Sequence, residues 1–206
     1  MNFKNKFNNF EIKYKEKFNQ LIKESPVEIE GRIEKLLNEG NQFLNENNLN
    51  NAEQKFTEVI SFDPRNLVAL KSLFKIYLTQ SKLPEAKKMG EYILQINKQS
   101  LKWWLKFNKA KANAPENLIS ELFLSLINLG DIYFKLGKKD EAIKYYKMAL
   151  AYHPSNPRIL DFLIENSIIL EKKDEAASYL MRIKESNPEN QKITEWEEKI
   201  KNMPNN

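Results

Sequence analysis

Apolar residues recur every three or four positions along most of this 206-residue chain, which is the spacing of amphipathic α-helices. The first such stretch, residues 1–24, has lysine and asparagine on the face opposite its apolar residues. Its apolar positions are Phe3, Phe7, Phe10, Tyr14, Phe18, Leu21 and Ile22. Ser25-Pro26 would end this helix, because proline disfavours helical angles in the residue before it. The pattern predicts an amphipathic N-terminal helix.

A longer pattern occupies residues 123–156, where small, aromatic and aliphatic residues stand at fixed places over 34 positions. Counted from Phe123, positions 4, 7, 8, 11, 15, 20, 24, 27 and 32 hold Leu126, Leu129, Gly130, Tyr133, Gly137, Ala142, Tyr146, Ala149 and Pro154. We expect Gly130 and Ala142 to face each other, because two helices approach closely only where small residues meet. Gly137 would supply the turn between the helices, and Pro154 would end the second one.

This arrangement resembles the tetratricopeptide repeat, a helix–turn–helix unit that stacks on its neighbours to bury a shared core. Segments 33–66, 67–100 and 157–190 repeat the pattern in phase. In the first of them, Asn47-Asn48 replaces the turn glycine, since asparagine tolerates left-handed backbone angles. In the second, the large residue Phe74 stands at position 8 and Gly90 at position 24, the reverse of the usual order. We expect the two residues to touch, so that the volume of the core is conserved.

The period breaks at residues 101–122. Residues 101–113 have the apolar residues Trp104 and Phe107 on one side, and we expect a separate, inserted helix there. The alternative is that the preceding helix continues without a stop, because neither proline nor glycine occurs from 91 to 114. Pro115 would start a long helix over residues 116–136.

The resemblance implies an all-α fold, an α-solenoid of antiparallel helix pairs of the tetratricopeptide repeat (TPR) type. The expected order is an N-terminal amphipathic helix (1–25), two repeats (33–100), a helical insert (101–122), two more repeats (123–190), and a capping helix with a tail (191–206). The capping helix is expected because Ile193, Trp196 and Ile200 share one face, and Asn190 is a candidate N-cap.

The net charge of +5 is concentrated in two short segments. Residues 1–25 carry six lysines and three glutamates, and residues 101–113 carry four lysines and no acidic residue. This suggests an anionic partner, a membrane surface or a nucleic acid, as an alternative function for these segments. A secondary surface would consist of Lys102, Trp103, Lys106, Lys109 and Lys111. Self-assembly through the N-terminal helix is a second alternative; the sequence leaves the oligomeric state open.

Little in the sequence points to catalysis or to a cofactor. Cysteine is absent, and the one histidine, His153, stands beside a helix-ending proline. No group of residues has metal-ligand spacing, no glycine-rich phosphate loop occurs, and no nucleophile–base set is evident. We therefore expect no enzyme, no metal and no cofactor. A cytoplasmic location is the default expectation, since we find neither an apolar signal segment nor a run of ~18 apolar residues.

In the tetratricopeptide family, positions 2, 5, 9 and 12 of the first helices point into a concave peptide groove. The resemblance implies a groove lined by Asn41, Lys71, Lys75, Leu124, Ile127, Asp131, Phe134, Arg158, Asp161, Glu165 and Ile168. This groove would be polar to basic in its first half, and apolar and acidic in its second half. The insert or a terminal helix could also fill it.

The resemblance thus implies a non-catalytic protein–protein interaction module, an adaptor or assembly factor that binds a helix or an extended peptide in this groove. One subfamily grips the C-terminal carboxylate of chaperone tails with a clamp of lysines and asparagines. The matching positions here are Leu37, Asn41, Ser72, Leu124 and Ile127. Only Asn41 has the required residue type, so the sequence does not favour a chaperone clamp.

Overall fold

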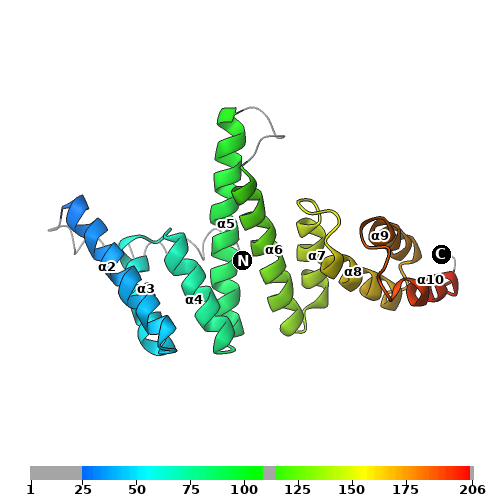
Figure 1. The fold of residues 1–206 in the computed structure, drawn as a ribbon, viewed down its shortest axis with the longest axis horizontal. Coiled ribbons are helices and arrows are strands. Elements are labelled where there is room, and N and C mark those ends of the chain that lie inside the picture. Colours follow the sequence, from blue (N-terminus) through cyan, green and yellow to red (C-terminus); the bar gives the residue numbers. More distant parts are fainter. Residues whose placement is uncertain (1–24, 109–114, 205–206) are drawn as a thin grey trace, which may run out of the picture. The chain divides into compact units, whose positions relative to one another are not determined.

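The computed structural model describes residues 25–108 and 115–204. The helix expected over residues 1–24 lies outside these ranges. The chain divides into two compact units, residues Met1–Lys109 and Ala110–Asn206, and each is described by itself. In both units, the described segments form α-helices that follow one another as antiparallel pairs (Figure 1).

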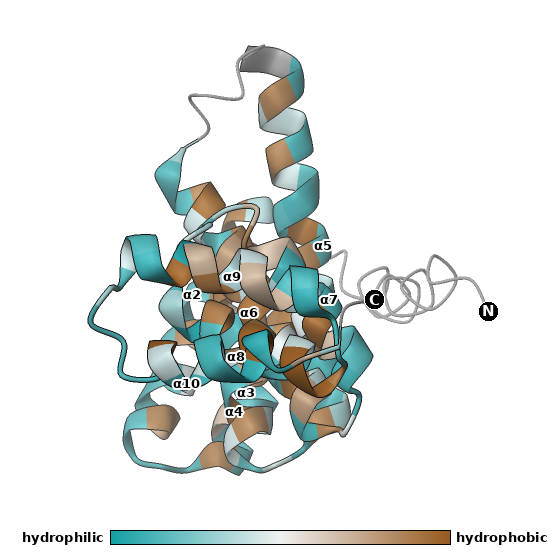
Figure 2. Cartoon of the chain, turned by 90° about the vertical axis from the view of Figure 1, so that its right-hand side faces the viewer, coloured by the Kyte–Doolittle hydropathy of each residue, from teal (hydrophilic) through white to brown (hydrophobic). Residues whose placement is uncertain are grey.

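The first unit contains α2 (Pro26–Asn45), α3 (Leu49–Phe62), α4 (Leu67–Thr79) and α5 (Leu83–Asn108). Helix α2 packs against α3, and α4 packs against α5, while α3 joins the two pairs by packing against α4. Each of these helices has apolar residues on one face and polar residues on the other. The colours of hydrophobic and hydrophilic residues therefore alternate along the ribbon (Figure 2). Phe56, Leu70 and Ile76 are among the largest side chains that this packing buries completely.

The second unit contains α6 (Glu116–Lys135), α7 (Lys139–Ala149), α8 (Pro157–Ile169), α9 (Lys173–Ser186) and α10 (Ile193–Lys201). Helices α6 and α7 form one pair, α8 and α9 form the next, and α10 packs against both α8 and α9. Trp196 and Ile200 of α10 are buried in this contact. The residue that caps α10 is Lys192 and not Asn190; the Asn190 side chain instead accepts a hydrogen bond from the Lys192 backbone N–H, 3.0 Å away.

The turn inside every helix pair has the same backbone geometry. One residue in each turn has a positive φ, and these residues are Asn47 (56°), Ser81 (57°), Gly137 (72°) and Glu171 (55°). In each case the next N–H donates to the carbonyl at position 11 of the repeat, five residues back, which is a Schellman motif. The prediction that asparagine takes the place of the turn glycine in the first repeat is therefore confirmed by Asn47. The 34-residue spacing between Asn47 and Ser81, and between Gly137 and Glu171, shows the repeat in the backbone itself.

Within the helix pairs, the glycine at position 8 packs closely against the opposite helix, but its nearest neighbour is not the residue expected from the sequence. A Cβ atom built on Gly130 would lie 2.6 Å from the ring of Tyr146, and one on Gly40 would lie 2.8 Å from the ring of Phe56. The nearest neighbour of the glycine at position 8 is therefore the aromatic residue at position 24, which the sequence pattern did not single out for this contact, and the approach of Gly130 to Ala142 stays a prediction. In the second repeat, Phe74 and Gly90 occupy these positions in reverse order, and both are buried. The contact between those two residues stays a prediction.

Two helix boundaries also differ from the expectation. Helix α5 runs without interruption to Asn108, as in the alternative in which the preceding helix continues. The prediction of a separate helix beginning at residue 101 is therefore wrong for the described residues. Without a proline or glycine the helix has no reason to stop. At the start of the first unit, Ser25-Pro26 begins a helix. The Ser25 Oγ accepts from the Glu28 N–H (3.4 Å), and the Ser25 N–H donates to the Glu28 carboxylate (2.6 Å).

The long helix expected over 116–136 is confirmed as α6, although Pro115 is its N-cap and not its first residue. On α5, Trp103 is 63% exposed, whereas Trp104 is half-buried. This order agrees with the placement of Trp104 on the apolar side of the segment in the sequence.

The glycine–aromatic contact predicts opposite effects for two alanine substitutions in the same helix. Gly40→Ala should destabilise the protein by roughly 1–3 kcal/mol, because the new methyl group would overlap the Phe56 ring. Gly31→Ala is the matched control, since a Cβ there meets nothing within 4 Å. It should gain up to about 1 kcal/mol from helix propensity. Thermal unfolding followed by circular dichroism measures both, and equal shifts in the two variants would contradict this packing.

The turn geometry predicts that glycine is preferred at position 171 as well as at 137. Gly137→Ala should lower stability by about 1 kcal/mol through backbone strain alone, because its Cβ would meet no other atom within 4 Å. Glu171→Gly should raise the melting temperature, because it relieves the strain of a positive φ in a residue that has a Cβ. If Glu171→Gly lowered the melting temperature as Gly137→Ala does, the positive φ would not be the controlling factor.

Candidate functional site

An open cavity of about 690 Å³ lies in the second unit, between α6 and α8. We call it the α6–α8 groove. It is lined by Asp131, Phe134, Lys135, Tyr146, Pro157, Arg158, Asp161, Phe162, Glu165 and Lys192. Five of these, Asp131, Phe134, Arg158, Asp161 and Glu165, are residues that the sequence placed in a groove. The structure therefore brings five of the eight residues predicted from the third and fourth repeats into one cavity.

Three aromatic rings form the apolar part of the groove. The Phe162 ring packs edge-on against Phe134, with 5.3 Å between the ring centroids, and against Tyr146, with 4.6 Å. These contacts join α6 and α7 to α8. Tyr146 is buried and Phe162 half-buried, but Phe134 is 46% exposed. The groove thus presents a fixed aromatic surface that is partly open to solvent.

Asp131 connects the aromatic surface to the charged wall on α8. Its Oδ1 accepts a hydrogen bond from the Tyr146 hydroxyl and forms a 2.6 Å ion pair with the guanidinium of Arg158. Burial raises the pKa of Tyr146, and the hydrogen bond to Asp131 adds to this effect. The same carboxylate raises the pKa of Arg158. Tyr146 is therefore a neutral hydrogen-bond donor, and Asp131 is held between two donors from different helices.

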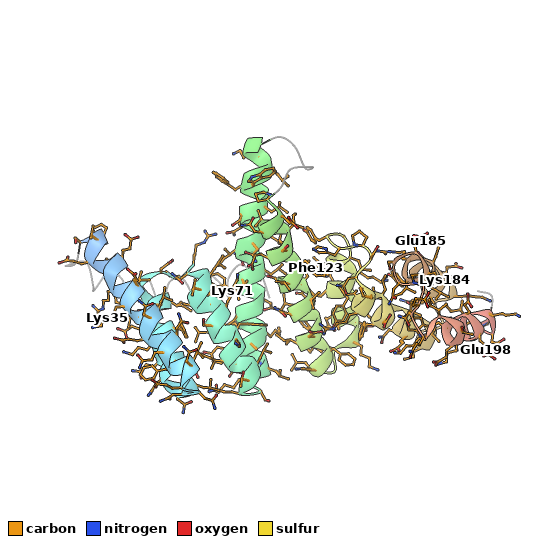
Figure 3. All side chains as sticks on the ribbon, in the orientation of Figure 1. Lys35, Lys71, Phe123, Lys184, Glu185 and Glu198 are labelled. Atoms are coloured by element: carbon orange, nitrogen blue, oxygen red, sulfur yellow. The ribbon has the colours of Figure 1, made fainter. Side chains whose placement is uncertain are left out.

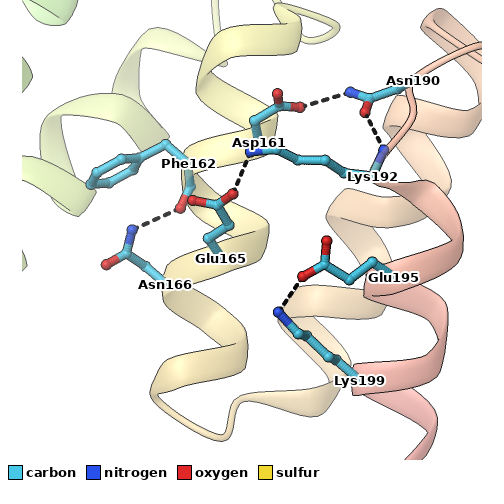
Figure 4. Close-up of polar contacts among 8 residues, drawn as sticks. All are labelled: Asp161, Phe162, Glu165, Asn166, Asn190, Lys192, Glu195 and Lys199. Carbon is cyan, nitrogen blue, oxygen red and sulfur yellow. Dashed lines mark hydrogen bonds and ion pairs between the residues drawn. The ribbon is translucent and has the colours of Figure 1, made fainter.

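A second set of polar contacts joins α8 to the turn before α10 (Figure 4). The Asn190 side-chain amide donates to Asp161 Oδ1 at 3.1 Å, and Lys192 Nζ lies 2.7 Å from Glu165 Oε1. Partial burial raises the pKa of Asp161, while the hydrogen bond from Asn190 opposes this shift. Glu165 raises the pKa of Lys192. The positions of both acidic residues are therefore fixed by the segment that leads into the last helix.

The lining is balanced in charge, which corrects the expectation of an acidic second half. Three carboxylates, Asp131, Asp161 and Glu165, are matched by three cations, Lys135, Arg158 and Lys192. The sequence reasoning missed Lys192 because it belongs to the turn before the capping helix. It missed Tyr146 and Phe162 because it considered only positions 2, 5, 9 and 12 of the first helices. The aromatic residue at position 24 is visible in the sequence as part of the repeat pattern, but the pattern does not place it in the groove.

The other predicted groove residues lie elsewhere. Ile127 is only 8% exposed and belongs to the core, so its assignment to an open groove is wrong. Leu124 is exposed and Ile168 half-buried, but neither lines the cavity. In the first unit, the predicted residues Asn41 on α2, and Lys71 and Lys75 on α4, are exposed; Lys71 is labelled in Figure 3. None of the three lines the cavity found on α2 of the first unit, which is formed by Gly31, Glu34, Lys35, Asn38, Glu39 and Gln42.

Of the expected secondary surface, Lys102, Trp103 and Lys106 are exposed residues near the end of α5, and Lys109 and Lys111 lie outside the described residues. His153 contacts Phe123, a residue of α6, with 4.1 Å between the ring centroids. Among the described residues, no group of three or more His, Cys, Asp or Glu side chains is placed to hold a metal ion. None of the described helices is long and apolar enough to cross a membrane.

Comparison with known proteins identifies the repeat directly. Residues 123–156 match the family model for the tetratricopeptide repeat. No curated protein sequence matches the chain. The fold is similar to that of a tetratricopeptide repeat protein from Parabacteroides merdae, with a TM-score of 0.59 and 19% identity over 84% of this chain, which spans 60% of that protein.

Two other solved structures share the fold. YrrB, described as a tetratricopeptide repeat protein with an unusual peptide-binding site, has a TM-score of 0.52 and 17% identity, over 80% of this chain and 82% of its own. The N-terminal domain of stress-induced protein-1 from C. elegans has a TM-score of 0.51 and 13% identity, over 65% of this chain and 92% of its own. The matched repeat, the 34-residue recurrence of the turns and the paired helices agree: residues 123–156 are a tetratricopeptide repeat, and the fold is that of a tetratricopeptide repeat solenoid.

Proposed function

We propose that this protein is a non-catalytic interaction module whose α6–α8 groove binds a helical or extended segment of another protein. The observation that carries the proposal is the groove itself, an open cavity of about 690 Å³ with an aromatic surface and charged walls. Ligand sites are usually concave, largely apolar and provided with a few well-placed polar groups. Tetratricopeptide repeat proteins in general bind other proteins or peptides, and an adaptor or assembly factor is the role that this implies.

The charged residues of the groove support recognition and not catalysis. Asp131–Arg158 ties α6 to α8, and Glu165–Lys192 ties α8 to the turn before α10. Ion pairs of this kind fix the shape of the walls and leave further donors and acceptors on the same groups for a ligand. A bound segment would place an apolar side chain on Phe134 and Phe162. Its polar groups would contact Arg158 on one side, and Glu165 with Lys192 on the other.

Phe134 is the residue that tests the proposal best, because it is the exposed aromatic ring of the groove. Short random peptides displayed on phage and selected on the full chain provide the ligands, and fluorescence anisotropy measures their affinity. Phe134→Ala should weaken groove-binding peptides by about tenfold or more, as expected for a central aromatic contact. Met181→Ala is the control, since Met181 is an exposed apolar residue of the same unit that does not line the groove.

Circular dichroism establishes that both variants are folded. If every selected peptide bound Phe134→Ala as tightly as the original protein, the α6–α8 groove would not be the binding site. If Met181→Ala lost the same peptides, the effect would not be specific to the groove.

A further inference from the structure

A second cavity, of about 510 Å³, lies in the same unit over α7 and the turn between α8 and α9. We call it the α7 surface. Its lining residues are Asp140, Ile143, Lys144, Lys147, Met148, Leu170 and Lys172. None of them belongs to the α6–α8 groove. Leu170 is 47% exposed, and Ile143 and Met148 are half-buried, so an apolar centre is open to solvent here.

The first unit provides an internal comparison, because the same repeat positions occur 90 residues earlier. There, the positions of Asp140 and Leu170 are held by Asn50 and Gln80, and the Gln80 side-chain amide donates to Asn50 at 3.4 Å. The positions of Ile143 and Lys172 are held by Glu53 and Lys82, whose side chains form an ion pair at 3.1 Å. In the first unit, therefore, polar side chains pair with each other across this face.

In the second unit these cross-links cannot form. Leu170 replaces the amide of Gln80, and Ile143 replaces the carboxylate of Glu53, while Lys172 keeps the position of Lys82 without that acidic partner. The same two repeat positions that close the face in the first unit thus open an apolar centre in the second. Exposed apolar residues with a polar rim are typical of docking surfaces.

The charge of the face also changes between the units. In the first unit, the equivalent positions hold Asn50, Glu53, Gln54, Thr57, Glu58, Gln80 and Lys82, with two acidic residues and one basic. In the second unit they hold one acidic residue, Asp140, and three basic ones. Lys147 pairs with Glu175 at 2.7 Å, and Lys144 and Lys172 are exposed on the rim. The net charge therefore changes from −1 to +2.

We propose that the α7 surface is a second docking site, which binds an acidic amphipathic segment of a partner protein. An apolar side chain of that segment would lie among Ile143, Met148 and Leu170, and its carboxylates would pair with Lys144 and Lys172. Opposite charge and an apolar centre together favour this partner. A nucleic acid or an anionic membrane would need the lysines, but not a recessed apolar centre between them. The site is independent of the α6–α8 groove.

The experiment uses the residues of the first unit as the substitution. A double variant, Lys144→Gln with Leu170→Gln, places at each position the residue that the first unit has there, so the helix pair is expected to stay folded. Displayed random peptides are selected on the full chain and compared on three proteins: the original, this double variant, and Phe134→Ala in the groove. We expect a class of peptides rich in Asp and Glu, with at least one large apolar residue.

These peptides should bind the double variant about tenfold or more weakly, and should bind Phe134→Ala normally. If no peptide depended on Lys144 and Leu170, or if the dependent peptides were not acidic, the proposal would be wrong. A single-stranded DNA oligonucleotide and phosphatidylserine vesicles are tested in parallel. Binding of either that required Lys144 but not Leu170, in the absence of dependent acidic peptides, would assign the surface to an anionic polymer or a lipid and overturn the proposal.

Discussion

The contact between the glycine at position 8 and the aromatic ring at position 24 sets the geometry of the helix pairs that contain it. In the α6–α7 pair, the absence of a side chain on Gly130 lets the Tyr146 ring lie directly against the backbone of α6. In this position the Tyr146 hydroxyl reaches Asp131, the residue next to the glycine. Asp131 in turn orients Arg158 on α8. A packing constraint within one pair therefore places the charged groups that form the wall of the groove.

The two surfaces of the second unit arise from different parts of the repeat. The α6–α8 groove uses first-helix residues together with Tyr146 from inside the pair and Lys192 from the turn before α10. The α7 surface uses second-helix residues and the turn after α8. The first unit has the same backbone plan but closes its equivalent of the α7 surface with Gln80–Asn50 and Lys82–Glu53. The two units thus share the same repeated backbone but carry different side chains at equivalent positions.

Much of the fold could be predicted from the sequence, because a 34-residue period constrains helices, turns and core positions together. Asn47 and Gly137 are residue types that favour a positive φ, so two of the four left-handed turns could be predicted locally. Ser81 and Glu171 carry no such local signal, and their turns could be predicted only from the 34-residue period. The groove was predictable where it depends on positions in the first helices. Lys192 was not, since its approach to Glu165 depends on how α10 packs on α8. The burial of Ile127 likewise depends on neighbouring helices and not on its own segment.

We propose that the α6–α8 groove, which is formed by the packing of α6, α7 and α8, binds a peptide. A crystal structure of the full chain with a selected peptide bound tests it most directly. We expect an apolar side chain of the peptide in contact with Phe134 and Phe162, with Asp131 still held between Tyr146 and Arg158. A peptide seated elsewhere on the chain, with the groove empty, would contradict it.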